Sequence, residues 1–348
     1  MAITNITLHS GSPLLGSPVY FRLTVVARSG VTFQRAKLKA TVKTFLPGDE
    51  YYDDEQAFEF SEPITSDGYI FIDVSSALRA MSDAYEYTPH TEAGTKSYPY
   101  FLLNASAWDE YMENGVFKTT ESSALSPVTP FYFFLGAFTD FERVQSSDAR
   151  GVTTLTRKPA NGEVVPADAP LYIYPLSFTY TADDWFSGTS HAAPTTTAVV
   201  VPGLLNNIPG RTVWQANIPD EYVAFQFVNG YGVIESAYAF TLPDESVTKT
   251  VKEYTISTPM RFNKINRNIV RKSGSRHVFK MSSGPVTEEW QQWWLEEFLN
   301  TEQCWMYHKG SWLPVSIVPD EETSAISRSK EDLPEVQFTV KLNIEGHK

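Results

Sequence analysis

Cysteine is almost absent from this chain, since Cys304 is the one cysteine among 348 residues. No internal disulfide can therefore form, and a zinc site that needs several cysteines is excluded. Cys304 itself lies in an apolar, strand-like run. We expect it to be a small core residue and not a reactive thiol.

Positive charge is scarce as well. The chain has 28 Lys and Arg against 41 Asp and Glu, which gives a net charge of −13 and an isoelectric point near 5.0. Nucleic acid repels a protein with this balance of charges. The chain as a whole is therefore not expected to read nucleic acid.

Long hydrophobic runs are also missing. Residues 1–9 have neither the basic segment nor the continuous apolar segment of a signal peptide. No run elsewhere approaches the length of a membrane span. We expect a soluble protein that is made in the cytoplasm without a signal peptide and has no membrane partner.

Aromatic residues, in contrast, are abundant. They form 14% of the chain, with 22 Phe, 18 Tyr and 8 Trp, and many Thr and Val accompany them. This composition favours strands, and 22 Pro and 19 Gly can supply the turns. We predict a mainly β fold with three parts. These are an N-terminal β-sandwich-like domain (1–145), an irregular β region (146–245) and a C-terminal α+β module (246–348).

Several segments of the first two parts have clear local signals. Ser75 can start a short helix after a strand. Residues 225–240 predict a hairpin, because Asn229-Gly230 readily adopts the positive φ values of a type I′ turn. Other strands are predicted at residues 19–26, 37–43, 68–74 and 131–135.

The C-terminal module combines one amphipathic helix with strands. Thr287 can cap the helix, and Glu288 and Glu289 suit the positive end of its dipole. Strands are predicted at 304–307, 312–318 and 336–344. Apolar residues at helical spacing, together with one strand residue, form the predicted structural core: Trp290, Trp293, Trp294, Phe298 and Trp312.

One motif suggests catalysis. Residues 188–194, Gly-Thr-Ser-His-Ala-Ala-Pro, are similar to the segment around the nucleophilic serine of subtilisin-like proteases, which places Ser190 at that position. The histidine and aspartate signatures of that family are missing before Ser190, and the alternating β and α pattern is missing too. We therefore predict a linker at this position.

Acidic and histidine residues give no stronger candidate. Residues 49–55 could hold Ca²⁺, but they lack the spacing and central glycine of an EF-hand loop, so a solvated acidic loop is expected. The six histidines are scattered, and none pairs at i, i+4. We predict no enzymatic activity, metal or cofactor. Carboxylates that could pair as in glycoside hydrolases are Asp183, Asp184, Glu235 and Glu288.

A basic stretch interrupts the acidic chain. Apolar residues alternate with its cations, which indicates β structure. Three interpretations remain open: a solvated face, a contact with the acidic surface of another subunit, and a nucleic-acid groove. We take the subunit contact as the working hypothesis for an assembly interface. Its residues are Arg261, Lys264, Arg267, Arg271, Lys272, Arg276 and Lys280.

The last third of the chain resembles a known group of proteins. Ser282-Ser283-Gly284 precedes the amphipathic helix, and residues 312–317, Trp-Leu-Pro-Val-Ser-Ile, precede the final alternating strand at 336–344. This pattern resembles the ends of tail or baseplate proteins from phages and prophages of Bacteroides-like bacteria. The resemblance implies a distal-tail or tail-tube-like module that closes into rings.

We therefore expect a structural protein of a bacteriophage virion, namely an oligomeric tail or baseplate adaptor subunit. Its expected partners are copies of itself in a ring and other tail proteins of the virion. The alternative is a receptor- or glycan-binding module that stacks a host-surface glycan on exposed Tyr and Trp side chains. An enzyme ranks third.

Overall fold

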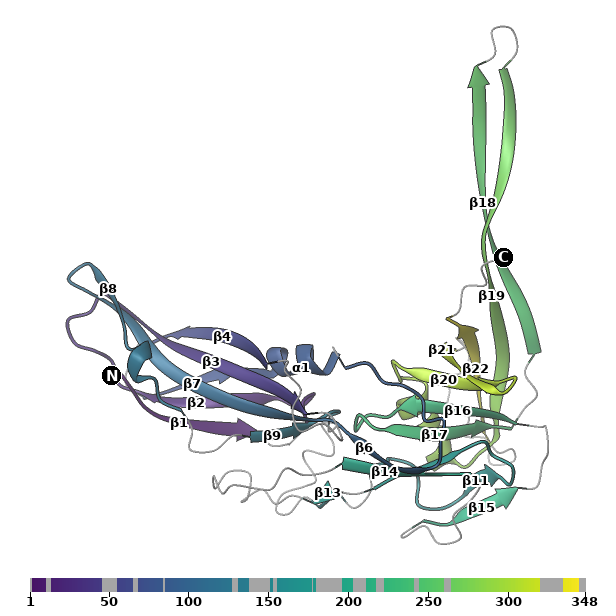
Figure 1. Cartoon of the computed structure of the whole chain (residues 1–348), viewed down its shortest axis with the longest axis horizontal. Coiled ribbons are helices and arrows are strands. Elements are labelled where there is room, and N and C mark those ends of the chain that lie inside the picture. Colours follow the sequence, from purple (N-terminus) through teal and green to yellow (C-terminus); the bar gives the residue numbers. More distant parts are fainter. Residues whose placement is uncertain are drawn as a thin grey trace.

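The computed structural model describes residues 2–10, 14–45, 55–64, 68–83, 85–126, 131–137, 151–152, 155–176, 178–179, 196–202, 211–216, 222–240, 244–259, 264–319 and 334–343. The protein is mainly β, which confirms the predicted fold class. Figure 1 shows an elongated body with a sandwich at the N-terminal end, a large sheet at the other end and a long β-hairpin that leaves this sheet.

The N-terminal sandwich consists of two antiparallel sheets. In the first sheet, β2 lies between β1 and β5. In the second, the order is β4, β3, β7 and β8, and β9 pairs with β7. The strands are β1 (Ile3–Ser10), β2 (Val19–Val25), β3 (Phe33–Phe45), β4 (Glu55–Pro63), β5 (Gly68–Asp73), β7 (Tyr100–Glu113), β8 (Val116–Thr119) and β9 (Phe131–Phe134).

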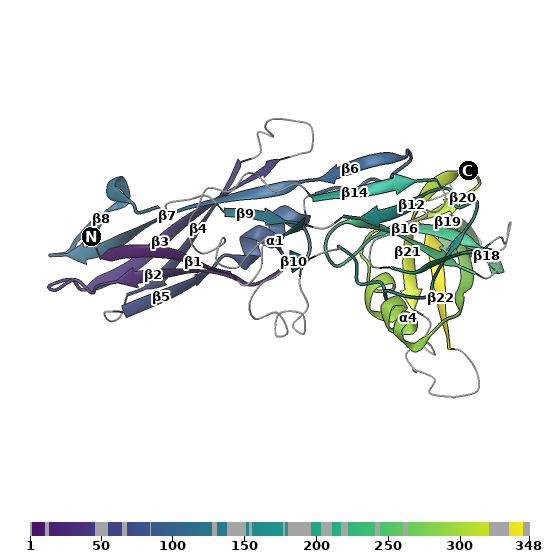
Figure 2. The same ribbon diagram turned by 90° about the horizontal axis from the view of Figure 1, so that it is seen from below.

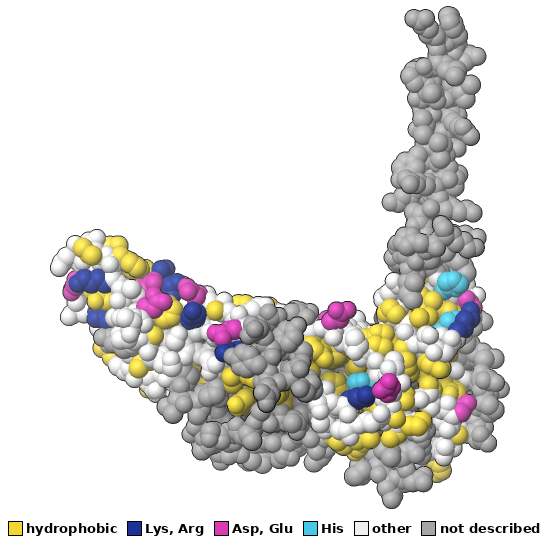
Figure 3. All heavy atoms as spheres, in the orientation of Figure 1, with side chains coloured by type: hydrophobic (Ala, Val, Ile, Leu, Met, Phe, Trp, Pro, Cys, Tyr) yellow, Lys and Arg dark blue, Asp and Glu magenta, His cyan; other side chains and the backbone are white. Residues whose placement is uncertain are grey.

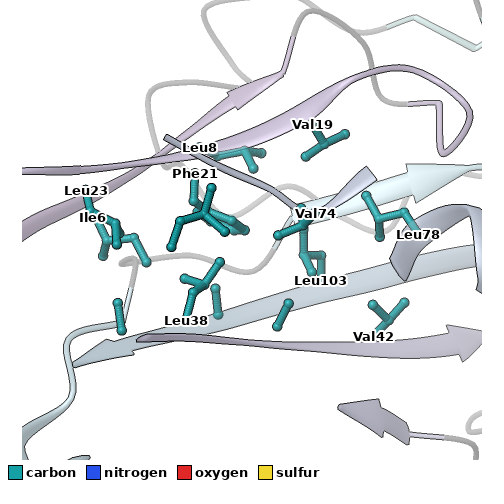
Figure 4. Close-up of a cluster of buried hydrophobic side chains, with 14 of the residues drawn as sticks. Ile6, Leu8, Val19, Phe21, Leu23, Leu38, Val42, Val74, Leu78 and Leu103 are labelled. Carbon is teal, nitrogen blue, oxygen red and sulfur yellow. The ribbon is translucent and has the colours of Figure 1, made fainter. Parts of the chain in front are cut away.

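One hydrophobic core lies between these two sheets (Figure 4). Alternate residues of β2 and β3 point into it, so Phe21 from the first sheet meets Leu38 and Leu103 from the second. Helix α1 (Ser75–Asp83) adds Leu78 at one end. A short 3₁₀ turn, η1 (Glu121–Ser123), follows β8. The predicted strands and the short helix at Ser75 are all present, whereas β1, β4, β7 and β8 were not predicted.

Short strands connect the two ends of the body. β14 (Thr196–Val201) lies between β12 (Tyr172–Pro175) and β6 (Gly94–Tyr98) in a small antiparallel sheet. A parallel pair and a second small pair complete this part. They are β11 (Glu163–Pro166) with β15 (Val213–Ala216), and β10 (Gly151–Val152) with β13 (Phe178–Thr179).

The C-terminal sheet has seven strands in the order β17, β16, β20, β21, β22, β19, β18. The hairpin predicted at residues 225–240 belongs to this sheet, because its strand β16 pairs with β20. The sequence had instead suggested that these residues belong to the middle region. The strands are β16 (Val223–Val228), β17 (Ile234–Ala239), β18 (Asp244–Pro259), β19 (Lys264–Pro285), β20 (Cys304–His308), β21 (Ser311–Pro319) and β22 (Glu335–Leu342).

The predicted amphipathic helix covers one face of this sheet. It begins as α4 (Glu288–Trp293) and continues as one π-helical segment, η2 (Trp294–Phe298). The Thr287 side chain accepts a hydrogen bond from the Trp290 amide, which is the expected cap. The aromatic side chains of the helix pack against strands β16 and β22. Trp290, Trp293, Trp294 and Phe298 are buried in this core. Trp312 is partly buried and packs instead against two other clusters, those that contain Tyr231 and Tyr238.

The turn of the predicted hairpin differs from the expected type I′ geometry. Val228 pairs with Ile234, so the loop has five residues, and Gly232 is its one residue with positive φ. The Asn229 side chain explains the difference. Its Oδ1 accepts hydrogen bonds from the amides of Tyr231 and Val233, which stabilises a wider loop.

Candidate functional site

The β18–β19 hairpin extends far beyond the sheet from which it starts. The two strands pair from Asp244–Lys280 to Pro259–Lys264, but β22 pairs with β19 only between residues 278 and 285. Residues 247–259 and 264–276 therefore form a ribbon, called the arm below. At about 3.3 Å per residue the arm is roughly 40 Å long. Figure 1 shows that it projects away from the body.

Among the described residues, the arm has no strand partner other than itself. A two-stranded ribbon without further packing is marginally stable in water, because too little apolar surface is buried to offset the ordering of the chain. Both outer edges of the arm also present backbone groups that can pair with another strand. The length of the arm and its open edges are therefore the features that a functional proposal has to explain.

The root of the arm is firmly anchored. Phe279 and Met281 of β19 are buried in the core of the C-terminal sheet. At the same level, the His277 imidazole lies 2.7 Å from a carboxylate oxygen of Glu245, its neighbour across the hairpin. Gly284 has a positive φ of 75° where β19 reaches the helix. The body thus fixes where the arm starts.

Charge is distributed very unevenly between residues 249–280, which include most of the arm, and the rest of the chain. Residues 249–280 contain nine of the 28 Lys and Arg but one of the 41 Asp and Glu, namely Glu253. The remainder has 19 cations against 40 anions, a net charge of −21. These residues and the rest of the chain therefore carry net charges of opposite sign.

The predicted interface residues lie on this hairpin as far as the structure describes them. Arg261 lies outside the described residues, and Lys280 is exposed at the root. For the others the backbone gives strand positions: Lys264 pairs with Pro259, Arg267 with Ile256, Arg271 with Lys252, Lys272 with Val251, and Arg276 with Thr248. The register of the two strands shifts between Thr250 and Val251, which is a bulge in the ribbon.

A second feature is a cluster of charged side chains inside the body. Lys158 Nζ lies 2.7 Å from Glu163 Oε1 and 3.7 Å from Glu235 Oε1. A guanidinium nitrogen of Arg211 lies 3.0 Å from Glu163 Oε2. All four side chains are at most 5% exposed. The cluster joins the segments around β11 and β15 to strand β17.

Hydrogen bonds complete the cluster. Thr156 and Asn229 donate to the two carboxylate oxygens of Glu235, the Asn229 bond being 3.2 Å long. The Tyr172 hydroxyl donates to Glu163 at 3.1 Å, and Lys158 donates to the Ser236 carbonyl at 2.5 Å. Such a satisfied network is what makes buried charges tolerable.

The two carboxyl groups of the cluster differ in proton affinity. Burial raises the pKa of Glu235, and the opposing charges of Lys158 and Arg211 do not outweigh it. Burial acts on Glu163 in the same direction, but Lys158 and Arg211 are closer and hold its pKa below the ordinary value. Glu163 is the ionised partner, and Glu235 is the acid that takes up a proton more readily.

The sequence suggests Glu235 as one member of a pair of glycosidase carboxylates. The acid that contacts Lys158 together with Glu235 is Glu163, which the sequence did not single out. Glu288 lies exposed at the start of the helix. Asp183, Asp184, Ser190 and the acidic run 49–54 lie outside the described residues. No local sequence pattern could have predicted this cluster. Glu235 lies far along the chain from Lys158 and Glu163, and Lys158 lies on an irregular segment that has no periodic pattern.

Cys304 is buried, and burial raises the pKa of its thiol well above the ordinary value. Within the described ranges, no group of three His, Cys, Asp or Glu side chains could hold a metal ion. No helix in that part of the chain is long and apolar enough to cross a membrane.

An aromatic face lies on the outside of the N-terminal sandwich. Tyr69 and Phe71 of β5 are 58% and 56% exposed, and Tyr20 of β2 is partly exposed beside them. The Arg22 guanidinium lies 3.4 Å from the centre of the Tyr69 ring. Figure 2 shows this sheet, with β1, β2 and β5, at the end of the body away from α4. We call Tyr20, Arg22, Tyr69 and Phe71 the aromatic face.

The rest of the visible surface is mixed. Figure 3 shows acidic and basic side chains near each other on the sandwich and hydrophobic side chains at its far end, around β8. There Val116, Phe117 and Phe33 are exposed.

Comparisons with known proteins leave the family open. No protein-family model matches this chain, and no curated protein matches it.

Proposed function

We propose that this protein is a structural subunit of a bacteriophage tail or baseplate, which assembles with copies of itself and with other tail proteins through the arm. The observation that supports the proposal most is the arm itself, roughly 40 Å of paired strands with which no further strand pairs among the described residues. The virion is the proposed location.

Backbone pairing would hold the arm on its neighbour. Each free edge offers amide and carbonyl groups that can extend a sheet of another subunit, which is how β-strand addition gains affinity. The basic composition of the arm would draw it to the acidic body of the next copy and set the register. Because the arm and the surface that receives it are different parts of the chain, the contact is head-to-tail, and such contacts close into rings or extend into tubes.

The C-terminal pattern adds a second, weaker support. Three segments resemble the ends of phage tail proteins: Ser-Ser-Gly, the capped helix and the final alternating strand. Ser-Ser-Gly and the final strand are part of the sheet from which the arm projects, and the helix packs on that sheet. The buried aromatic core below the arm would make this sheet a rigid base. A rigid base is what an arm needs to reach a fixed position on a neighbour.

Removal of the arm tests the proposal. Val247 and His277 face each other across the hairpin, so residues 248–276 can be replaced by an Asn-Gly turn without strain in the remaining strands. The core of the C-terminal sheet contains no arm residue, so this variant is expected to fold. We expect multimers of the intact protein by light scattering and electron microscopy, and monomers of the shortened protein.

Charge reversal separates electrostatic attraction from the mere presence of the arm. Arg267→Glu, Arg271→Glu and Lys272→Glu together are expected to abolish assembly or to slow it strongly. The matched control reverses three exposed cations of the body, Lys39, Arg79 and Lys118, and changes the net charge by the same amount. Unchanged assembly of the arm triple variant would exclude the electrostatic contact. Binding of DNA or RNA by the isolated protein, lost in the same variant, would favour the nucleic-acid groove instead.

The aromatic face supports a second candidate function, a glycan-binding module. Exposed Tyr and Phe rings can stack on the apolar face of a sugar ring, while Arg22 and the neighbouring Asp73 and Thr24 can hydrogen-bond its hydroxyl groups. A glycan array probed with the intact protein and with Tyr69→Ala/Phe71→Ala tests it. The control is Phe117→Ala, which removes an exposed aromatic ring on β8, in the other sheet of the sandwich. Retention of glycans by the intact protein that only the double variant loses would establish this function.

A further inference from the structure

The buried cluster around Lys158 has the parts that a reaction between an amine and a carboxyl group needs. The Lys158 amino group lies 3.7 Å from a carboxyl oxygen of Glu235 and 2.7 Å from Glu163 Oε1. The Lys158 and Glu235 side chains are 2% and 1% exposed. Two reactants held this close and out of water have a very high effective concentration.

The two carboxyl groups suit two different roles. Glu163 lies between Lys158 and Arg211 and stays ionised, so its carboxylate can accept a proton from the Lys158 ammonium group 2.7 Å away and is a poor target for a nucleophile. Burial raises the pKa of Glu235, so Glu235 is protonated more readily than Glu163, and a neutral carboxyl group is the form that an amine can attack. Environments that shift the pKa values of two neighbouring acids in opposite directions are typical of acid–base pairs in active sites.

Two donors are directed at Glu235. The Thr156 hydroxyl contacts Oε1, and the Asn229 amide nitrogen lies 3.2 Å from Oε2. They can stabilise the negative charge that develops on oxygen when a nucleophile adds to the carboxyl carbon. The Tyr172 and Trp293 rings lie 5.7 Å and 5.4 Å from Lys158 Nζ and keep water away from the amine.

We propose that Lys158 and Glu235 become joined by an isopeptide bond, which the folded chain forms by itself with Glu163 as its acid–base residue. This goes beyond the proposed assembly function and does not depend on it. Glu163 first takes a proton from the Lys158 ammonium group. The free amine then attacks the carboxyl carbon of Glu235, and a C–N bond forms. Glu163 passes its proton to the departing hydroxyl group, which leaves as water, and takes the second proton from nitrogen. No oxidant or other reactant is needed.

The bond would tie the segment that precedes β11 to strand β17, which lies in the sheet that carries the arm. The two residues are 77 positions apart in the sequence. A covalent link across such a loop restricts the unfolded chain and would resist forces applied to the body.

The mass of the intact, purified wild-type protein tests this directly. We expect the chain to be lighter than its sequence by one water molecule, with fragment ions that show a branched peptide containing Lys158 and Glu235. Lys158→Arg should restore the sequence mass, because a guanidinium group is a very poor nucleophile. Glu163→Gln should restore it too, because the proton acceptor is lost while both reacting groups remain.

Two outcomes would overturn the proposal. The first is a wild-type protein that has its full sequence mass. The second is a missing water that maps elsewhere, for example to a cyclic imide at Asp67-Gly68, and persists in Lys158→Arg. Circular dichroism of both variants shows whether they fold, and the wild-type mass decides the question even if they do not.

Discussion

At the scale of single residues, a buried carboxylate with several hydrogen-bond donors connects parts of the sandwich, as the charged cluster around Lys158 connects segments of the body. Asp109 lies on β7 with a fully buried side chain. It accepts hydrogen bonds from Arg28 at 2.6 Å, from Thr120 at 2.6 Å and from the amide of Ala2 at 3.3 Å. One carboxylate thus connects the start of the chain to the second sheet, and its loss would leave several buried donors without a partner.

We predict that Asp109→Ala lowers the free energy of unfolding by about 3–5 kcal/mol, because it leaves a partly buried arginine unpaired. Glu113→Ala, in the same hairpin, removes the partner of the exposed Lys118 and should change stability far less, because water screens this pair. Urea unfolding of both variants measures the difference. Similar losses in the two variants would show that the Asp109 contacts contribute little.

His90 gives the protein a pH dependence. Burial, helped by the nearby Lys96, lowers its pKa from 6.5 to about 4, and its ring contacts the Tyr98 hydroxyl at 3.1 Å. The unfolded chain therefore binds a proton that the folded chain does not bind between these two pKa values. Stability is consequently lost as the pH falls from about 6.5 towards 4.

We predict that His90→Gln reduces this acid-side loss. The test is urea unfolding of wild type and variant at about pH 7 and about pH 5, with the difference between the two pH values compared for each protein. The wild type should lose more stability than the variant over this interval. Equal losses would mean that other groups cause the pH dependence.

At the scale of elements, turn type depended on side-chain contacts that the sequence pattern does not reveal. Asn229-Gly230 did not form the predicted type I′ turn, because the Asn229 side chain bonds to its own loop and to Leu155. Asn114-Gly115 and Lys309-Gly310 do have two successive positive φ values, and each closes a two-residue hairpin loop. The Asn-Gly signal at residue 114 could have predicted β7 and β8.

The loop between β16 and β17 contacts the segment after β9 backbone to backbone. A Cβ atom on Gly136 would lie 2.2 Å from the Tyr231 carbonyl carbon, and one on Gly232 would lie 2.5 Å from Leu135 Cβ. Only glycine permits this approach, and it joins the sandwich to the C-terminal sheet.

We predict that Gly136→Ala is about 1–3 kcal/mol more destabilising than Gly30→Ala. Both glycines have positive φ, but a Cβ on Gly30 would meet no atom within 4 Å. Backbone strain is therefore matched, and the pair isolates the close approach to Tyr231. Equal thermal shifts for the two variants would contradict a tight contact at this junction.

At the scale of the whole molecule, local patterns predicted more than long-range arrangement. Periodicity and the Thr287 cap predicted the C-terminal helix and its neighbouring strands, because these depend on nearby residues. The arm was predicted as basic β structure, but its length and its freedom from the sheet follow from where β22 stops pairing with β19. The buried cluster could not be predicted, since only the folded chain brings Lys158 next to Glu235.

The central claim is that the arm assembles copies of this protein. The most direct test is the molar mass in solution, by light scattering, of the intact protein and of the variant in which Asn-Gly replaces residues 248–276. We expect multimers of the intact protein and folded monomers of the variant. A monomeric intact protein, or a variant that assembles as well as the intact protein, would contradict it.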